Sequence, residues 1–277
     1  MDRNFLLKKS NQLRLEVLEI AKKTGVGHIA SAFSCAEILT ALYYGGVLNF
    51  RSDNPTWEKR DRFLLSKGHA CSIFYCLLAD LGYFPKETLL SMAQAGSMFG
   101  VHLQCNVPGA EISSGSLGMG FGIGNGIALA AKLNRETYMT FVLMGDGECY
   151  EGSVWESAYF SAHHKLNNLV VIIDNNHMCA TDFIESVLQM EPLDKKFEAF
   201  GFNVKRIDGH NPLELIEALK GIRCRKSSRP LAIIADTVKA KGLKDVENTL
   251  LSHTYSPGPQ KIDDDIKRIK VLYEESC

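Results

Sequence analysis

The stretch YMTFVLMGDGECYEGSVWESAYFSAHHKLNNLVVIIDNN, residues 138–176, decides the fold. It begins and ends with continuous apolar runs, 138–144 and 168–176, which are typical of strands covered on both faces. A helical segment separates the two runs, and two parallel neighbouring strands require such a crossover. The stretch therefore predicts a strand, a helix and a second strand of one parallel sheet.

The rest of the chain extends this pattern in both directions. PLAIIADTV (230–238) is a third strand of the same kind, and DRFLL (61–65) and the less apolar FNVKRIDG (202–209) are further candidates. Helices are expected over 3–23, over 34–46 behind a capping box of Ser34 and Glu37, over 68–83, over 85–94, and from about 263 as an exposed polar helix. We predict an α/β fold, with one domain over residues 1–277 and helices on both faces of a mostly parallel twisted sheet.

Composition excludes several classes of protein. The 277 residues include 45% hydrophobic residues, which argues against disorder, and a net charge of -1, which argues against a nucleic-acid-binding protein. No apolar stretch approaches the roughly 18 residues of a membrane span. The cysteines are scattered without a C-x-x-C pair, which argues against a zinc site or disulfide framework and indicates a cytoplasmic protein.

The motif GDG at 145–147 follows one predicted strand, and Asn176 ends the next. Ligands of open α/β sheets bind outside the carboxyl ends of the strands, so Asp146 and Asn176 are expected to converge there. Carboxylate and amide oxygens are hard ligands, and phosphate oxygens, a backbone carbonyl and a water would complete a six-coordinate Mg²⁺ site. A tight turn with a capping aspartate is the alternative for GDG alone, and the matching asparagines after the second strand disfavour it.

The same stretch resembles the thiamine diphosphate motif of transketolases, which begins with GDG and ends with asparagine after a strand. Four more blocks resemble that family in the same order: GVGHIASAFSCAEILTALYY, DRFLLSKGHA, PGAEISSGSLGMGFGIGNGIALAAKLN and VKAKGLKDVENTLLSH. The resemblance implies the family's diphosphate-binding (PP) domain, with thiamine diphosphate and Mg²⁺, or Ca²⁺ or Mn²⁺, as cofactors.

The resemblance also implies roles for individual residues. Asp146, Asn176 and the carbonyl of Met178 would hold the metal ion, and Glu151 would lie at a subunit contact. The residues expected to face the reacting carbon are His28, His69, His102 and His253. The residues expected to bind the cofactor are His69, Gly115, Ser116, Leu117, Gly145, Asp146, Gly147, Glu148, Asn176, Met178, Lys239 and His253. Imidazoles suit proton transfer near neutral pH.

A few positions depart from the family pattern or have no catalytic role in it. His102 lies in GVHLQ where the family has GHP, and Ala30 replaces a glycine, so both could reshape the substrate end of the pocket. His210 in IDGHN resembles a family motif and is interpreted as structural. The glycine stripes of GSLGMGFGIGNG lack a dinucleotide fingerprint and favour close helix packing against another subunit.

Thiamine diphosphate enzymes need a glutamate at N1′ of the aminopyrimidine, which transketolases carry in a second, pyrimidine-binding domain. The resemblance covers only the diphosphate-binding half. It therefore implies the N-terminal subunit of a split transketolase, which moves a two-carbon ketol unit between sugars or sugar phosphates. A C-terminal subunit would supply the pyrimidine-binding domain, as an α2β2 assembly, with no nucleic-acid or membrane partner.

Two other interpretations stay open at this point. The chain could be a subunit of another thiamine enzyme that uses a pyruvate-type donor, such as a 2-oxo acid dehydrogenase α subunit or a 1-deoxyxylulose-5-phosphate synthase relative; Ala30 keeps that open. It could also be a non-catalytic scaffold of the same fold. The histidines and SKGHA favour transketolase over the first, and the intact Asp146 and Asn176 argue against the second.

Overall fold

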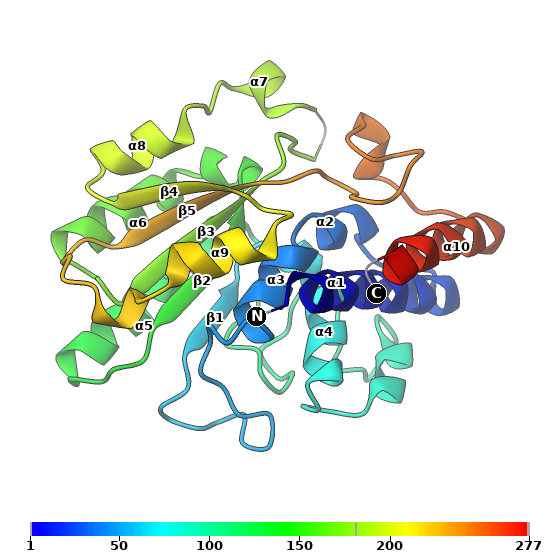
Figure 1. The fold of residues 1–277 in the computed structure, drawn as a ribbon, viewed down its shortest axis with the longest axis horizontal. Helices are drawn as coiled ribbons and strands as arrows, with labels where there is room; N and C mark the ends of the chain where they lie inside the picture. The colour runs from blue at the N-terminus through cyan, green and yellow to red at the C-terminus, as the bar shows by residue number, and fades with distance from the viewer. Residues whose placement is uncertain (1, 181, 276–277) are drawn as a thin grey trace.

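A five-stranded parallel sheet forms the centre of the structure, a computed structural model that describes residues 2–180 and 182–275 (Figure 1). The strands are β1 (Arg62–Leu65), β2 (Thr140–Gly145), β3 (Leu169–Asn175), β4 (Asn203–Asp208) and β5 (Leu231–Asp236). Their order is β1-β2-β3-β5-β4, and every neighbouring pair is parallel. The predicted parallel α/β sheet is confirmed, including the less apolar strand β4.

Helices cover both faces of this sheet. Successive side chains of a strand point to opposite faces, so Phe141 and Leu143 of β2 join one core while Val142 and Met144 join the other. The first core lies under α1 (Arg3–Thr24), α2 (Ile29–Ser34), α3 (Ala36–Tyr43), α4 (Cys71–Asp80) and α9 (Pro212–Leu219). The second lies under α5 (Met119–Leu133), α6 (Gly152–His163) and α8 (Leu193–Ala199).

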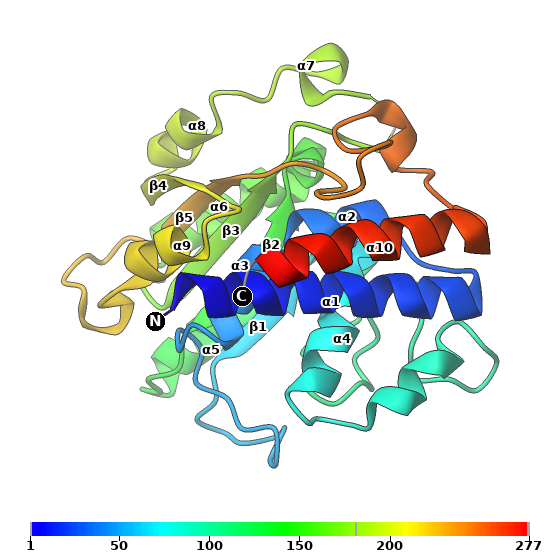
Figure 2. The same ribbon diagram turned by 45° about the vertical axis from the view of Figure 1, so that its right-hand side comes forward.

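The C-terminal helix differs from the prediction. It begins at residue 259 as α10 (Pro259–Glu275), and it packs along α1 rather than standing in solvent (Figure 2). Ile262, Ile266 and Ile269 recur at helical spacing and are buried in this contact. Because α10 is polar on average, its narrow stripe of apolar residues was not recognised in the sequence. Among the described residues, no helix combines the length and apolarity needed to cross a membrane.

Two local predictions are wrong. The capping box of Ser34 and Glu37 does not form, because Cys35 separates two short helices and caps the second without a side-chain hydrogen bond. Both side chains instead make buried long-range contacts, Ser34 with Asp174 and Glu37 with Arg14. Pro85 is followed by a single 3₁₀ helix, Lys86–Ser91, instead of an α-helix.

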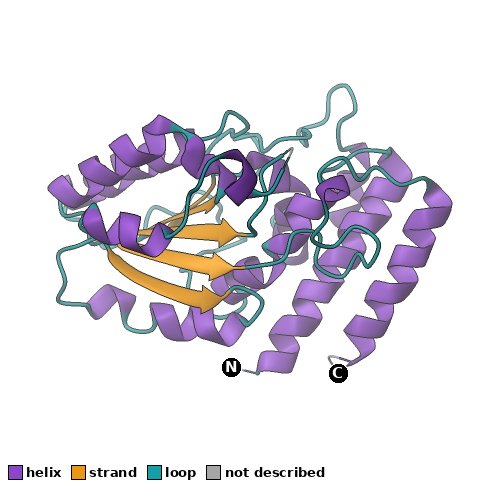
Figure 3. Ribbon diagram, turned by 90° about the horizontal axis from the view of Figure 1, so that it is seen from above, coloured by secondary structure: helices purple, strands orange, loops and turns teal. Residues whose placement is uncertain are grey.

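All five strands run in one direction, so their carboxyl ends share one edge of the sheet (Figure 3). The register pairs Gly145 with Asp174 and Asn175 with Asp236. Loops that follow β1, β2, β3 and β5 therefore meet over this edge. It is the place where an α/β sheet binds its ligands.

Candidate functional site

A cavity of about 470 Å³ opens at the carboxyl edge of the sheet. Its volume is within the range of small-molecule and cofactor sites. Most residues predicted for the site line it: His28, His69, His102, Gly115, Leu117, Gly145, Asp146, Gly147, Glu148, Asn176, Met178, Lys239 and His253. The cavity therefore brings together side chains that are up to 225 positions apart, from His28 to His253.

Two predicted residues lie outside this lining. Ser116 is exposed beside Gly115 and Leu117, and Glu151 is exposed immediately before α6. Glu151 packs against Gly118 at the N-terminus of α5, where a Cβ on the glycine would lie 2.6 Å from the glutamate Cβ. The expected cofactor contact of Ser116 and subunit contact of Glu151 stay predictions.

Four histidines of the cavity lining form a cluster around His28. The ring centroid of His28 lies 6.0 Å from that of His69, 5.3 Å from that of His102 and 6.2 Å from that of His253. Each comes from a different element: His28 precedes α2, His69 lies in the 3₁₀ turn Gly68–Ala70, His102 lies in a loop, and His253 follows Leu250–Ser252. The altered sequence around His102 has not moved that ring away from the cluster.

Burial keeps three of these imidazoles uncharged near neutral pH. Burial lowers the pKa of His28, and the neighbouring His102 lowers it further. Burial, with Lys67 beside it, holds the pKa of His69 well below its usual value. Burial and Lys239 lower the pKa of His253. The buried Nδ1 of His28 has no hydrogen-bond partner among the described residues, so a ligand in the cavity could use it.

Asp146 and Asn176 directly follow the neighbouring strands β2 and β3, and both line the cavity. Asp146 accepts backbone hydrogen bonds from Gly147 at 2.8 Å and from His177 at 2.5 Å, and Asn176 Oδ1 accepts one from Met178 at 3.2 Å. Burial, together with the nearby Asp174, raises the pKa of Asp146 to about 7. Burial and the negative charge of Asp174 thus disfavour the charged form of the Asp146 carboxyl.

A buried ion pair, to which no sequence motif assigned a role, contributes Lys67 to the lining of the cavity. Lys67 Nζ contacts the carboxylate of Asp174, and both side chains are at most 1% exposed. Asp174 also accepts hydrogen bonds from Ser34, at 2.6 Å, and from Thr237. Although burial opposes its charge, Asp174 raises the pKa of Lys67 above its usual value. The only signal was a lysine within SKGH, whose partner lies 107 positions away.

Lys239 is the second lysine in the cavity, and its surroundings differ. Its Nζ donates to the carbonyl of Cys179 at 2.7 Å, with no carboxylate of the described residues in contact. Burial, and the positive charge of Lys67, lower the pKa of Lys239 to about 8. The two lysines make the cavity attractive to an anion on one side of Asp146.

Glu148 joins three loops of the cavity wall. Its carboxylate accepts hydrogen bonds from the Ser66 hydroxyl, from Gly118 N at 2.9 Å and from Gly145 N at 3.3 Å. These groups follow β1, begin α5 and end β2, respectively. Glu148 therefore shapes the cavity, and its oxygens are already occupied by protein donors.

Ser31, Tyr150 and Val187 also line the cavity, although no sequence motif pointed to them. The Tyr150 hydroxyl lies 2.8 Å from the Ile184 carbonyl oxygen and 3.0 Å from that of Leu188. It thereby connects the short helix α7 (Ile184–Val187), whose Val187 lines the cavity, to the turn after β2. No sequence motif predicts this contact, because it forms only when residues 184–188 fold back onto Tyr150.

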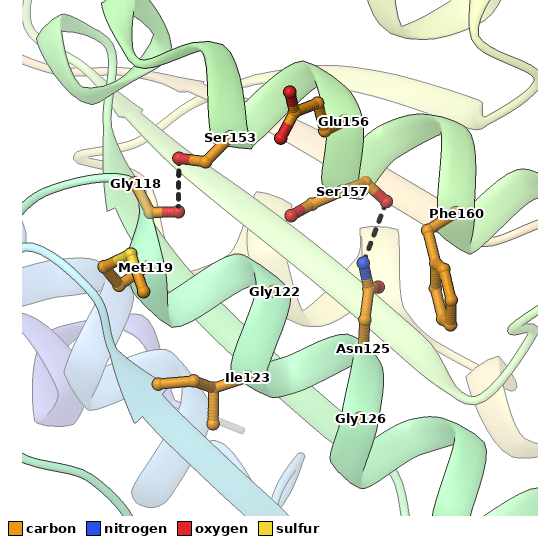
Figure 4. Close-up of a pocket in the computed structure, with 10 residues that line it drawn as sticks. All are labelled: Gly118, Met119, Gly122, Ile123, Asn125, Gly126, Ser153, Glu156, Ser157 and Phe160. Carbon is orange, nitrogen blue, oxygen red and sulfur yellow. Dashed lines mark hydrogen bonds between the residues drawn. The ribbon is translucent and has the colours of Figure 1, made fainter.

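A second groove, of about 460 Å³, lies between α5 and α6 (Figure 4). Gly122 and Gly126, which have no side chains, line the groove, and the exposed side chains of Met119, Ile123 and Phe160 surround it. The glycine stripes were expected to pack against another subunit, and for one stripe this is wrong. A Cβ at Gly124 would lie 2.6 Å from Val142 Cγ2, so Gly120 and Gly124 pack within the chain instead.

The parallel sheet and the cavity at its carboxyl edge define an α/β domain of the kind that binds small-molecule ligands at that edge. A family model described as "Transketolase, thiamine diphosphate binding domain" matches residues 7–274. The chain therefore belongs to the transketolase family, through its thiamine diphosphate-binding domain.

Relatives of two lengths match the chain. A 6-deoxy-6-sulfo-D-fructose transketolase subunit from Clostridium sp. is 37% identical over 88% of this chain and 89% of its own length. An apulose-4-phosphate transketolase subunit from Phocaeicola vulgatus is 34% identical over 96% of this chain and 94% of its own length. Human transketolase is also 34% identical over 96% of this chain, which covers 42% of that protein.

Solved structures agree with this assignment. The crystal structure of transketolase from Campylobacter jejuni has a TM-score of 0.85 and 28% identity over 100% of this chain. This chain covers 48% of that one, so it spans about half the length of the transketolase structure it matches.

Proposed function

We propose that this protein is the N-terminal subunit of a two-component transketolase. In this role it transfers a two-carbon ketol unit from a ketose or ketose phosphate to an aldose acceptor, using thiamine diphosphate. The carrying observation is one cavity that combines a four-histidine cluster, the Asp146–Asn176 pair and two buried lysines. A 2-oxo acid dehydrogenase α subunit would not be expected to carry this set of histidines.

Thiamine diphosphate fits the groups that the cavity offers. Lys67 and Lys239 provide positive charge for a diphosphate, and the orphaned Nδ1 of His28 provides a polar contact above it. When bound, the cofactor supplies the electron sink that carbon–carbon bond cleavage next to a carbonyl requires.

The proposed metal ion would lie between Asp146 and Asn176. The described residues contain no group of three histidine, cysteine, aspartate or glutamate side chains able to hold a metal. The chemistry of the oxygen donors supports Mg²⁺ (or Ca²⁺ or Mn²⁺) held jointly by Asp146, Asn176, the Met178 carbonyl and the phosphates, because Mg²⁺ commonly uses one or two carboxylates plus phosphate oxygens. The raised pKa of Asp146 supports the same proposal, since a cation would relieve the buried charge.

The chain's own residues would bind and orient the sugar. The lowered pKa values of His28, His69 and His253 leave imidazoles that can both donate and accept hydrogen bonds. Such groups can hold sugar hydroxyls and can move a proton between a hydroxyl and a carbonyl oxygen. His102 packs against Gly115, where a Cβ would lie 3.5 Å from its ring, so it would limit the substrate end of the cavity.

The proposed partner is a C-terminal subunit with a pyrimidine-binding domain and its glutamate, in an α2β2 assembly. Two relatives of similar length are named as transketolase subunits, which supports a separate partner chain. Exposed apolar side chains next to the cavity and the α5–α6 groove support a docking surface there: Val101, Met119, Ile123, Val187, Leu188, Leu250 and Leu251. Scattered cysteines support a cytoplasmic location.

Calorimetric titration of thiamine diphosphate with Mg²⁺ into wild type and into Asp146→Ala tests the cofactor proposal. We expect wild type to bind and D146A to lose at least about tenfold in affinity, because metal-ligand loss removes several contacts at once. Unchanged binding in D146A would contradict the metal assignment. Turnover of ketose phosphates by the purified chain alone would contradict the two-component proposal.

A further inference from the structure

His210 connects a buried ion pair of the helical layer to the segment that carries Lys239. Its Nδ1 lies 2.9 Å from Glu37 Oε2, and its Nε2 accepts a hydrogen bond from the backbone N–H of Val238 at 2.8 Å. Glu37 in turn receives two hydrogen bonds from Arg14, at 2.5 and 2.7 Å. Arg14 and Glu37 are at most 4% exposed, so their pair is shielded from water, and the His210 side chain is 15% exposed.

The hydrogen bonds fix how the imidazole is protonated. Nε2 faces an N–H group that can only donate, so Nε2 must be the bare nitrogen. Nδ1 then carries the proton and donates it to Glu37, whose pKa Arg14 and His210 hold at about 2 although burial opposes its charge. The ring therefore has one defined orientation, with its acceptor directed at Val238.

Hydrogen bonds from three of its residues hold the segment 237–240, which directly follows β5. Thr237 donates its hydroxyl to Asp174, Val238 donates to His210, and Ala240 N donates to Ala30 O at 3.2 Å. Lys239 lies between the last two anchors, is 3% exposed, and enters the cavity. Its direction thus depends on where Val238 is held.

Gly209 permits this close approach. A Cβ at this position would lie 2.4 Å from Thr237 Cγ2 and 2.9 Å from the carbonyl oxygen of Asp236. The turn after β4 can therefore lie directly on the segment 237–240, which brings the His210 ring within reach of Val238. A larger residue would push the two segments apart.

We propose that His210 is a positioning residue: through the Val238 N–H it directs Lys239 toward the diphosphate of the cofactor. The Arg14–Glu37 pair keeps the ring in the orientation that this requires. This inference rests on the proposed function for the identity of the ligand. His210 itself lines no part of the cavity, so it acts only through the backbone that it holds.

Two substitutions separate the contacts of His210. His210→Asn retains an amide that can donate to Glu37 but has no acceptor that reaches Val238. His210→Gln is longer, and its carbonyl oxygen can still accept from Val238. We expect H210N to weaken Mg²⁺–thiamine diphosphate binding by about tenfold in calorimetry, the equivalent of one net hydrogen bond, and H210Q to recover most of it.

A double-mutant cycle distinguishes positioning from general loosening. In the background of Lys239→Met, H210N should cause no further loss of affinity, because its effect passes through the Lys239 ammonium. Thr40→Val is the matched control, since it removes the buried 2.9 Å contact between Ser10 and Thr40 and the 3.1 Å bond from Thr40 to the Glu37 carbonyl oxygen, while the Glu37 carboxylate and Val238 keep their contacts with His210. Additive losses in the cycle, or equal losses in H210N and T40V, would overturn the proposal.

Acetylation followed by mass spectrometry gives a readout without cofactor. Lys239 should react several-fold faster in H210N than in wild type, relative to the half-exposed Lys241, while H210Q and T40V stay near wild type. Unchanged Lys239 reactivity in H210N would contradict the positioning role. If the wild type did not bind thiamine diphosphate but Lys239 still reacted faster in H210N, the proposed function would be contradicted. The positioning of Lys239 by His210 would then still be established.

Discussion

The two lysines of the cavity have the same side chain and different charge behaviour. Lys67 contacts the carboxylate of Asp174, which raises its pKa, whereas Lys239 donates to a backbone carbonyl and its pKa is lowered to about 8. Burial alone would have lowered both pKa values. The Asp174 carboxylate therefore accounts for the difference. It keeps Lys67 charged, whereas Lys239, without such a partner, loses its proton just above neutral pH.

This difference predicts a pH dependence for anion binding. Lys239 is mainly protonated at pH 7 and loses its charge as the pH rises through about 8, so affinity for Mg²⁺–thiamine diphosphate should fall. We expect a loss of up to about tenfold between pH 7 and 9, measured by calorimetry in matched buffers. Lys239→Met should bind weakly at both values; a step of the same size in that variant would assign the titration to another group.

The Arg14–Glu37 pair predicts a second effect at the scale of single residues. Arg14→Met would leave a buried carboxylate without its main partner and should lower the free energy of unfolding by about 3–5 kcal/mol in urea titrations. The folded-state pKa of Glu37, about 2, lies below its ordinary 4.5, so the pair's contribution is complete above 4.5 and is lost as the pH falls toward 2. Lys195→Ala, at an exposed pair, is the control and should change little.

At the scale of elements, continuous apolar runs were enough to predict β2, β3 and β5, because strands that are buried on both faces consist almost entirely of apolar residues. Local polar patterns were a poor guide. Ser34 and Glu37 have capping-box spacing, yet their partners Asp174 and Arg14 lie 140 and 23 positions away. The histidine cluster was predictable from motifs, whereas the Lys67–Asp174 pair required knowledge of which strand ends are neighbours.

Helix α5 offers a matched pair of glycines. Gly124→Ala would place a Cβ 2.6 Å from Val142 Cγ2 and should destabilise the protein by about 1–3 kcal/mol through overpacking. Gly126→Ala meets open space and should stabilise the isolated chain by about 0.5–1 kcal/mol through helix propensity. Thermal and urea unfolding of both variants provide the measurement. Equal effects would show that α5 does not pack on β2 as described.

At the scale of the whole molecule, the cavity and the α5–α6 groove are both surrounded by exposed apolar side chains. Monomeric proteins seldom leave such a surface uncovered. Where α10 lies on α1, the exposed large apolar residues are fewer: Phe5 of α1 and Val271 and Leu272 of α10. The surface around the cavity and the groove is therefore the better candidate for association.

This asymmetry predicts which substitutions affect assembly. Ile123→Asp, at the edge of the groove, should weaken binding to the proposed pyrimidine-binding subunit by at least about tenfold, because it places a charge in an apolar contact. Val271→Asp on α10 should leave binding unchanged. Sedimentation velocity of each variant mixed with the partner measures both. Loss of binding in V271D, with I123D unaffected, would place the interface on the other side.

The strand order also constrains how the chain can fold. Strand β5 follows the other strands in sequence, yet it lies between β3 and β4. During synthesis β4 emerges earlier but has no neighbour in the sheet until residues 231–236 arrive. Lys205 and Arg206 on β4 carry charges that discourage a waiting strand from pairing with another chain. Insertion of β5 then joins the two parts of the sheet and delivers Lys239 in the same step, so a cofactor-competent cavity forms only when the sheet closes.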